Sequence, residues 1–367
     1  MDLINHIAHF KKHNALFFLY KRLKCFQYDR LKDFVDSWYS DCDKQEALIK
    51  SMKRCFIFLG VTYEDYWKRA FESKGIREKM DFVPYSVQTS LYHQVNPLEK
   101  YGFLLENKKA CYDFFKRYYK REMVSVEESE IELNVRSNEV VAFLKNNDRF
   151  VIKPINSSGG RGVELINTTD KDIGDVIDEL YNKNPQGFIL EEFINQSREM
   201  ALFHPKSINS IRIITINYGD EIEIKWPFLR VGRGDSVVDN ARAGGIIVTI
   251  DVNTGITFAA GDETRHLYKT HPDSGVSLLG YKIPHWSELC ELAREMASLC
   301  PDCHIMGWDM ALTDDGWIVV ECNYGPNLVY QYVSGEGFAR EFALVRKRLG
   351  AKKYNGYYWS WQFMPQY

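Results

Sequence analysis

The segment FVIKPINSSGGRGVELI, residues 150–166, decides how this sequence is interpreted. Two short apolar runs flank a loop of glycine and other small residues, a pattern typical of a β-hairpin with a flexible tip. Lys153 precedes the tip and Arg161 lies within it. Glycine lets backbone N–H groups approach an anion closely, and both side chains are cationic, so the hairpin suits a polyphosphate. It is not a Walker loop, since no G-K-[ST] follows. Taken alone, the same pattern also describes an ordinary mobile turn.

The composition is that of a globular protein. The chain has 367 residues, of which 45% are hydrophobic and 26% charged, and its formal net charge is −3. This length suits two or three domains, and the lack of a basic excess argues against bulk nucleic-acid binding. There is no signal-peptide pattern and no apolar run approaching ~18 residues. The eight cysteines are scattered, which favours free thiols in a reducing compartment. We therefore expect a cytoplasmic protein without a transmembrane segment.

One pair of cysteines is closely spaced, Cys300-x-x-Cys303, and His304 follows it. These residue types can bind zinc, but a zinc site of the usual kind needs a second pair, which the sequence lacks. The pattern therefore favours the other interpretation, the buried end of a helix.

Residues 1–100 are expected to be helical, because apolar residues recur there at helical spacing with lysines between them. We find no chemistry in this region. Its basic positions form either a solvated helix face, which we favour, or a face that rests on an anionic membrane surface: Lys11, Lys12, Lys21, Arg22 and Lys24.

A helix is expected to begin after Asn107, whose side chain can accept from N–H groups of the first turn. Lys108 then lies in that turn, where the helix dipole disfavours a cation unless an anion is near. An exposed lysine is the alternative. A strand over 124–126 and a helix around 140–144 follow, and a further helix is expected over 171–181.

The strand GFILEEFI, residues 187–194, is apolar and stops on two acids. A buried strand followed by free backbone amide and carbonyl groups suits the amino edge of adenine. A carboxylate a few residues later, such as Glu199, suits ribose hydroxyls.

The alternating segment SINSIRIITINY, residues 207–218, places Arg212 inside a strand, where an arginine rarely stays buried without a partner. A return strand over 222–229 and a further strand over 246–251 follow, and residues 286–300 are expected to form a helix. Between the predicted strands 222–229 and 246–251 lies a polar, glycine-rich segment. It contains Arg230, Arg233, Asp239, Asn240, Arg242, Gly244 and Gly245.

A second group of candidate functional residues lies on a predicted hairpin. Its strands are IMGWDMAL and WIVVECN, and the turn between them is at residues 313–316. If the hairpin is centred near Asp315, Asp309 faces Glu321 across the ladder and Asn323 lies two residues further on the same side. Two facing carboxylates repel unless a cation lies between them. Hard oxygen ligands suit Mg²⁺, so the three residues are candidate metal ligands. The alternative is three unrelated polar residues near a turn.

Taken in order, these segments resemble the ATP-grasp superfamily over roughly residues 100–340. The similar motifs are VIKPxxSSGGRGV, ILEEFI and GWDMAL…VECN. The segments SINSIRI and AxAGG are most similar to the branch associated with sugar transfer and surface-polysaccharide gene clusters.

The resemblance implies a role for each matched residue. Lys108 and Lys153 would hold ATP phosphates, and Arg212 would face the transferred phosphate. Mg²⁺ would be held by Asp309, Glu321 and Asn323. The flap over the phosphates would be Ser158, Gly159, Gly160 and Gly162, and the adenine and ribose contacts would be Glu191, Glu192, Phe193, Ile194 and Glu199. Arg242 and the Gly244–Gly245 amides could bind the acid substrate, because a guanidinium and free N–H groups suit a carboxylate.

The expected fold is α+β: an ATP-grasp fold with two subdomains whose antiparallel sheets clamp ATP. We expect a helical region at 1–100, a first subdomain at 101–195, a second at 196–345 and a C-terminal tail at 346–367. Many relatives begin with a Rossmann-like domain, but no G-x-G-x-x-G or βαβ pattern occurs here.

The resemblance implies carboxylate–amine ligation through an acyl phosphate, with uronic acid units of a surface or capsular polysaccharide as the candidate acid to be amidated. The substrates would be a small-molecule or saccharide carboxylate and an amine. A kinase on the same scaffold and a non-catalytic nucleotide-binding module are the alternatives.

Overall fold

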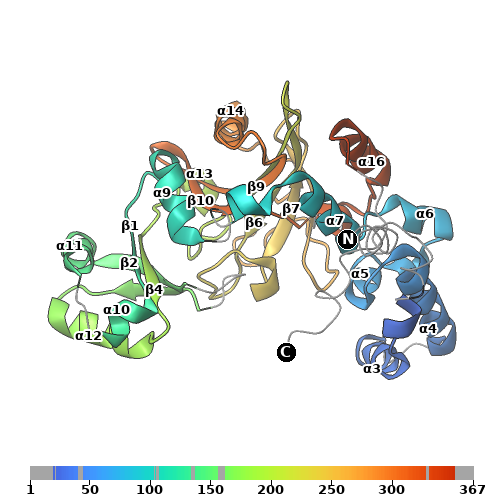
Figure 1. Cartoon of the computed structure of the whole chain (residues 1–367), viewed down its shortest axis with the longest axis horizontal. Helices are drawn as coiled ribbons and strands as arrows, with labels where there is room; N and C mark the ends of the chain where they lie inside the picture. The colour runs from blue at the N-terminus through green and yellow to red at the C-terminus, as the bar shows by residue number, and fades with distance from the viewer. Residues whose placement is uncertain are drawn as a thin grey trace, which may run out of the picture. The chain divides into compact units, whose positions relative to one another are not determined.

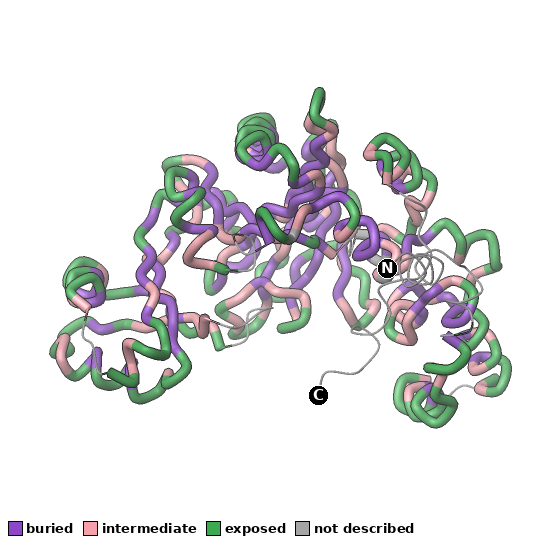
Figure 2. The backbone as a smooth tube through the Cα atoms, viewed as in Figure 1, coloured by how far each residue is buried: buried purple, intermediate pink, exposed green. Residues whose placement is uncertain are grey.

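The computed structural model describes residues 20, 22–39, 44–102, 104, 107–133, 137–155, 162–327 and 330–351. The chain forms two compact units: Met1–Pro97 with Asn327–Tyr367, and Leu98–Pro326. Figure 1 labels their helices and strands, and Figure 2 shows that buried backbone follows the strands of the second unit. The division into four segments expected from the sequence stays a prediction.

The first unit is helical, as expected. Its helices pack around a core that includes Leu31, Val35, Met52 and Phe71. A π-helical turn, η1 (Cys55–Leu59), ends at Gly60, which adopts φ 72°. The elements are α3 (Tyr28–Trp38), α4 (Gln45–Arg54), η1 (Cys55–Leu59), α5 (Tyr63–Lys68), η2 (Phe71–Ser73), α6 (Ile76–Asp81), α7 (Tyr85–Val95), α15 (Tyr330–Ser334) and α16 (Ala339–Arg348).

Of the basic residues proposed for a solvated or membrane-facing helix, Lys24 is exposed, as both interpretations require. Lys11, Lys12 and Lys21 lie outside the described residues. Arg22 is buried, and its Nη1 donates to the carbonyl oxygen of Ile57 at 2.8 Å. Its placement on an exposed face was therefore wrong, because the guanidinium satisfies a backbone carbonyl inside the unit. In the described ranges, no helix is both long enough and apolar enough to cross a membrane.

The second unit contains a small antiparallel sheet with the strand order β1-β4-β2-β3. The strands are β1 (Met123–Val126), β2 (Arg149–Pro154), β3 (Glu164–Asn167) and β4 (Phe188–Glu192). Three helices accompany it (Figure 1): α10 (Glu128–Glu132), α11 (Asn138–Asn146) and α12 (Ile173–Lys183).

Alternation along these strands separates a packing face from a chemical face. Ile152 and Leu190 belong to the core formed with α11 and α12. Lys153 and Glu191, each one residue further along, therefore project from the opposite face. The neighbouring Ile189 joins the core of the large sheet, so this face turns toward the rest of the unit.

The large antiparallel sheet has the order β10-β9-β5-β6-β7-β8. Its core also takes in residues of α9 (Lys108–Tyr119) and α14 (Trp286–Ser298). The strand β8 was not expected from the sequence, and β6 runs two residues beyond the predicted end. The strands are β5 (Ile211–Asn217), β6 (Ile222–Val231), β7 (Ile246–Ile250), β8 (Thr257–Gly261), β9 (Ile305–Thr313) and β10 (Gly316–Asn323). The α+β architecture is confirmed.

Candidate functional site

The β9–β10 hairpin brings the three candidate metal ligands to neighbouring positions. Glu321 pairs with Asp309, and Asn323 pairs with Gly307 on the same strand. The expected cross-strand pairing of the two carboxylates is therefore confirmed.

That pairing depends on a β-bulge in β10. Pairs from the turn to Val319 follow one register, and from Glu321 onward the register is shifted by one residue. The extra residue, Val320, is what brings Glu321 rather than its predecessor opposite Asp309. The sequence analysis predicted the correct pair because it centred the hairpin on Asp315. In the structure the turn lies between Thr313 and Gly316, and the bulge makes up the difference in register.

Asp309 is fully buried and paired with two arginines. Its Oδ1 accepts from Nε of Arg212 at 2.6 Å, and its Oδ2 accepts from Nη2 of Arg212 at 2.7 Å and lies 3.1 Å from Nη1 of Arg230. Burial would raise the pKa of Asp309, but the two guanidinium groups outweigh it and hold that pKa below its ordinary value. The positive charge of these two arginines therefore offsets part of the repulsion expected between the facing carboxylates.

Arg230 is a functional candidate that sequence reasoning missed. Its Nη2 lies 3.3 Å from Asp239 and donates to Ser210 Oγ at 2.8 Å. Burial lowers the pKa of Arg230, but Asp239, Asp309 and Glu321 together raise it above its ordinary value. The predicted return strand ended at 229, which left Arg230 in a loop. Because β6 continues to Val231, Arg230 is a strand residue beside Asp309.

On the small sheet, Lys153 and Arg121 share one carboxylate. Oε2 of Glu191 lies 2.8 Å from Nζ of Lys153 and 3.0 Å from Nη2 of Arg121. Burial would raise the pKa of Glu191, but Lys153 and Arg121 outweigh it and lower that pKa to about 2. Glu191 is therefore an anion that holds Lys153 in place.

Arg121 also reaches the other sheet and was likewise missed. Its guanidinium donates to the carbonyl oxygens of Val319 and Val320, the latter at 3.2 Å. These are the residues of the β10 bulge, so one side chain joins β4 to the hairpin that carries Glu321. No local pattern marks Arg121, because its partners lie far along the chain.

Lys108 connects the two halves of the site. Asn107 caps α9 as expected, since its Oδ1 accepts from the N–H of Ala110 at 2.9 Å. Nζ of Lys108 donates to the carbonyl oxygen of Ile155 at 3.3 Å. Burial lowers the pKa of Lys108; nearby Glu321 opposes that shift and Lys153 adds to it. Lys108 therefore lies within electrostatic range of both the glycine hairpin and the acidic hairpin.

The remaining adenine, ribose and flap candidates stay predictions. Ser158, Gly159 and Gly160 lie outside the described residues. Gly162 has φ +69°, a conformation that suits glycine.

The end of β4 is held by local contacts. The Glu192 carboxylate accepts from the N–H of Glu122 at 3.0 Å, and the Arg149 guanidinium lies 3.8 Å from the ring centroid of Phe193. Ile194 packs with Ala311 of β9. The segment predicted to meet adenine is therefore anchored to both sheets.

Glu199 and Arg242 are not joined to the charged cluster by the contacts found among the described residues. Glu199 lies in the first turn of the short helix α13 (Arg198–Ala201), and its carbonyl oxygen accepts from the Tyr281 hydroxyl at 3.1 Å. Arg242 is exposed on the 3-10 turn η4 (Ala241–Ala243), where its N–H donates to Asn240. Their roles toward ribose and the acid substrate stay predictions.

Cys300 and Cys303 lie buried at the end of α14. Burial raises the pKa of each thiol to about 12. His304 Nδ1 contacts the carbonyl oxygen of Asn217 at 2.6 Å. In the described parts of the chain, no three His, Cys, Asp or Glu side chains are grouped to hold a metal ion.

Two antiparallel sheets that meet at a cluster of lysines, arginines and acids define a protein of the ATP-grasp class. The model of the sugar-transfer associated ATP-grasp family matches residues 86–347, and the chain belongs to that family. The resemblance inferred from the sequence is thereby confirmed.

Solved structures with a similar fold are distant in sequence. VanG D-Ala:D-Ser ligase from Enterococcus faecalis has 13% identity over 67% of this chain and 62% of its own, with a TM-score of 0.43. D-Alanine-D-alanine ligase from Helicobacter pylori has 14% identity over 67% and 60%, with a TM-score of 0.39. D-Cycloserine synthetase DcsG has 14% identity over 69% and 73%, with a TM-score of 0.42. The chain thus spans less than two thirds of the first two ligases. No curated protein matches the sequence.

Proposed function

We propose that this protein is an ATP-dependent carboxylate–amine ligase that acts through an acyl phosphate. The observation that carries the proposal is one connected charged cluster across the two sheets of the second unit. Lys153 and Glu191 are paired on the small sheet, Lys108 lies within range of both and of Glu321, and Glu321 faces Asp309. A site that mainly positions phosphates and neutralises their charge needs this combination of groups.

In this proposal the lysines bind the nucleotide and the arginines bind the transferred group. Lys108 and Lys153 hold ATP phosphates beneath the flap of Ser158, Gly159, Gly160 and Gly162. Arg212, held by Asp309, faces the phosphoryl group in transfer. Adenine meets the segment Glu191–Ile194, and Glu199 meets ribose. Arg242 and the Gly244–Gly245 amides bind the acid substrate.

The acidic hairpin fits a divalent cation. Asp309 Oδ1 accepts one hydrogen bond, from Arg212, which leaves it further acceptor capacity. Among the described side chains, none donates to the half-buried carboxylate of Glu321, and the amide oxygen of Asn323 is likewise unclaimed. We infer that Asp309, Glu321 and Asn323 would hold Mg²⁺. A bound Mg²⁺ would supply charge neutralisation for the phosphates.

The protein groups then act by position. The carboxylate oxygen of the acid attacks the γ-phosphorus, the bond to the β,γ-bridging oxygen breaks, and ADP leaves. The amine next attacks the acyl carbon, phosphate leaves, and a proton is released. Neither step requires a cysteine or serine nucleophile. Lys108, Lys153 and Arg212 would offset negative charge throughout.

The acid that we propose is a uronic acid unit of a surface or capsular polysaccharide, amidated in the cytoplasm with an amine or amino acid. The support is the sugar-transfer description of the family together with the ligation chemistry that the site suits. A screen of acids and amines for ADP release tests this, and release should require both substrates.

Hydroxylamine trapping tests the acyl phosphate directly. A hydroxamate that forms with ATP and the acid supports the ligase, whereas ADP release with a hydroxyl acceptor alone identifies a kinase. ATP binding without turnover of any pair would identify a non-catalytic module. Lys153→Ala and Glu321→Ala should each abolish turnover in a folded protein, and full activity in either variant contradicts the assigned roles.

A further inference from the structure

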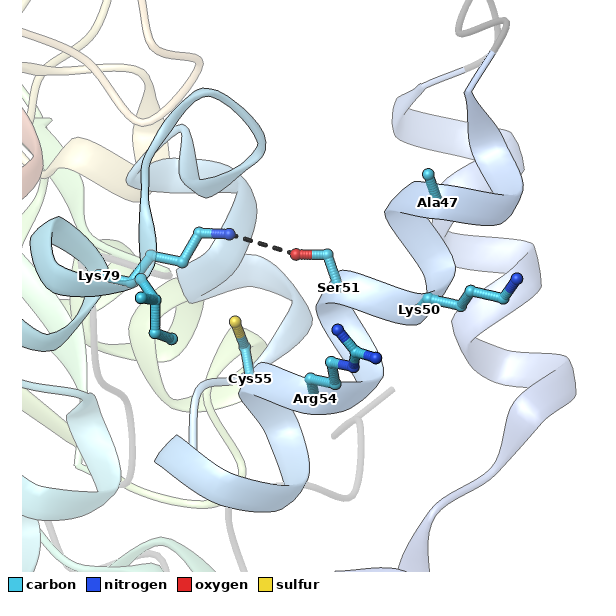
Figure 3. Close-up of a pocket in the computed structure, with 7 residues that line it drawn as sticks. Ala47, Lys50, Ser51, Arg54, Cys55 and Lys79 are labelled. Atoms are coloured by element: carbon cyan, nitrogen blue, oxygen red, sulfur yellow. Dashed lines mark hydrogen bonds between the residues drawn. The ribbon is translucent and has the colours of Figure 1, made fainter.

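The helical unit carries a cavity of about 390 Å³ that takes no part in the site above. It lies between one face of α4 and one face of α6, and Cys55 of η1 completes its wall (Figure 3). The α4 positions are spaced three and four residues apart, so they project on the same side of the helix. The lining residues are Ala47, Lys50, Ser51, Arg54, Cys55, Ile76 and Lys79.

Lys79 is a half-buried cation in this cavity. Its Nζ donates to Ser51 Oγ at 3.2 Å, the contact drawn in Figure 3, and lies 5.2 Å from the ring centroid of Tyr66. Tyr66 in turn donates to Ser51 at 2.9 Å. These neutral groups orient the ammonium without neutralising it, and within the described ranges no carboxylate pairs with it. A cation partly removed from water in this way favours an anion beside it.

Two further cations share the cavity. Lys50 is exposed and pairs with Glu46 at 2.7 Å. The guanidinium of Arg54 has no hydrogen-bond or ion-pair partner among the described residues, and no carboxylate lines the cavity. The wall between the cations is apolar: Ala47 and Ile76 carry no polar side-chain atoms, and burial raises the pKa of the Cys55 thiol, which keeps it neutral.

We propose that this cavity binds the phosphate monoester of a small organic molecule. A monoester carries close to two negative charges near pH 7, which matches the Arg54 and Lys79 pair better than a single carboxylate does. The planar guanidinium offers several donors to phosphate oxygens, and the ammonium adds a point charge. The volume is within the range of small-ligand pockets, and the apolar wall leaves room for a compact organic body. The inference does not depend on the ATP site.

The test is calorimetric titration of the full chain with glucose 1-phosphate, inorganic phosphate, glucuronate and glucose, at fixed ionic strength. Glucose 1-phosphate should bind at least about tenfold more tightly than glucuronate, and glucose should not bind. Arg54→Met and Lys79→Met should each weaken the binding about tenfold or more. Lys53→Met is the matched control, since Lys53 is on the same turn of α4 but lies over the Phe26 ring instead.

The Lys153→Ala variant separates this cavity from the proposed nucleotide site. Binding that survives Lys153→Ala and is lost in Arg54→Met supports the proposal. Binding that is lost in Lys153→Ala but kept in Arg54→Met belongs to the nucleotide site and overturns it. Equal affinity for glucuronate overturns the phosphate assignment, and no binding up to about 10 mM overturns the site itself.

Discussion

Replacing Arg121 with methionine should destabilise the second unit by about 3 kcal/mol. The side chains of Arg121 and Glu191 are 3% and 5% exposed, and their N–O distance is 3.0 Å. Removing one partner of a buried ion pair costs about 3–5 kcal/mol, because the other charge stays buried. Glu191 keeps Lys153 at 2.8 Å, which places the loss at the lower end. The bulge carbonyls also lose their donor.

Differential scanning calorimetry of the full chain measures this loss. For a unit of this size, about 3 kcal/mol corresponds to a fall in Tm of roughly 6–12 °C. Arg117→Met is the matched control, because Arg117 and its partner Glu295 are 64% and 53% exposed. An exposed pair contributes less than about 1 kcal/mol.

A double-mutant cycle between Arg121→Met and Glu191→Gln should give a coupling energy of about 1 kcal/mol or more. Strictly additive effects would show that the two side chains do not act as a pair. An equal Tm shift in Arg121→Met and Arg117→Met would refute the assignment of a buried link between the sheets.

Three further results are expected. The folded-state pKa of Glu191, about 2, lies below its ordinary value of 4.5, so the contribution of its charge to stability is complete above about pH 4.5 and disappears as the pH falls toward 2. The free energies of unfolding of the wild type and of Glu191→Gln, measured by urea unfolding, should therefore converge over that pH range. A constant difference between the two across the range would contradict this. Gly162→Ala places a Cβ 2.8 Å from Pro154 at a residue with φ +69°, so it should weaken ATP binding about tenfold in a nucleotide titration. An unchanged affinity would show that the proposed flap does not depend on the backbone conformation of Gly162. Gly307→Ala places a Cβ 2.7 Å from Pro326, so the segment that follows Asn323 must shift, and the Mg²⁺ concentration needed for half-maximal turnover should rise; an unchanged Mg²⁺ dependence would show that the proposed ligands do not depend on this segment.

Much of the fold was predictable because several strands are short apolar runs bounded by turn residues. The strands Phe188–Glu192, Ile211–Asn217 and Ile305–Thr313 are buried at nearly every position, and such runs stand out in the sequence. The strand β8 was missed, since its sequence, Thr257–Gly261, is short and rich in small residues.

The candidate site was predictable where two carboxylates fall opposite each other in the expected register of a hairpin, as Asp309 and Glu321 do. Arg121 and Arg230 were not identified, because their importance arises from partners distant in sequence. Arg121 meets Glu191 and the Val320 carbonyl, and neither contact leaves a trace in the local pattern. The bulge in β10 could not be predicted either, because one extra residue in an apolar run does not change the periodicity measured over a short window.

The bulge at Val320 makes the hydrogen bonds of the buried Arg121 depend on the length of β10. In a chain whose β10 is one residue shorter, the strand would pair with β9 without interruption. Because β10 is an edge strand, the ladder would then take up one of two successive carbonyls. An arginine at the position of Arg121 would lose one of its two acceptors in the bulge and would be more costly to keep buried. The extra residue in β10 and the buried arginine therefore depend on each other in this chain.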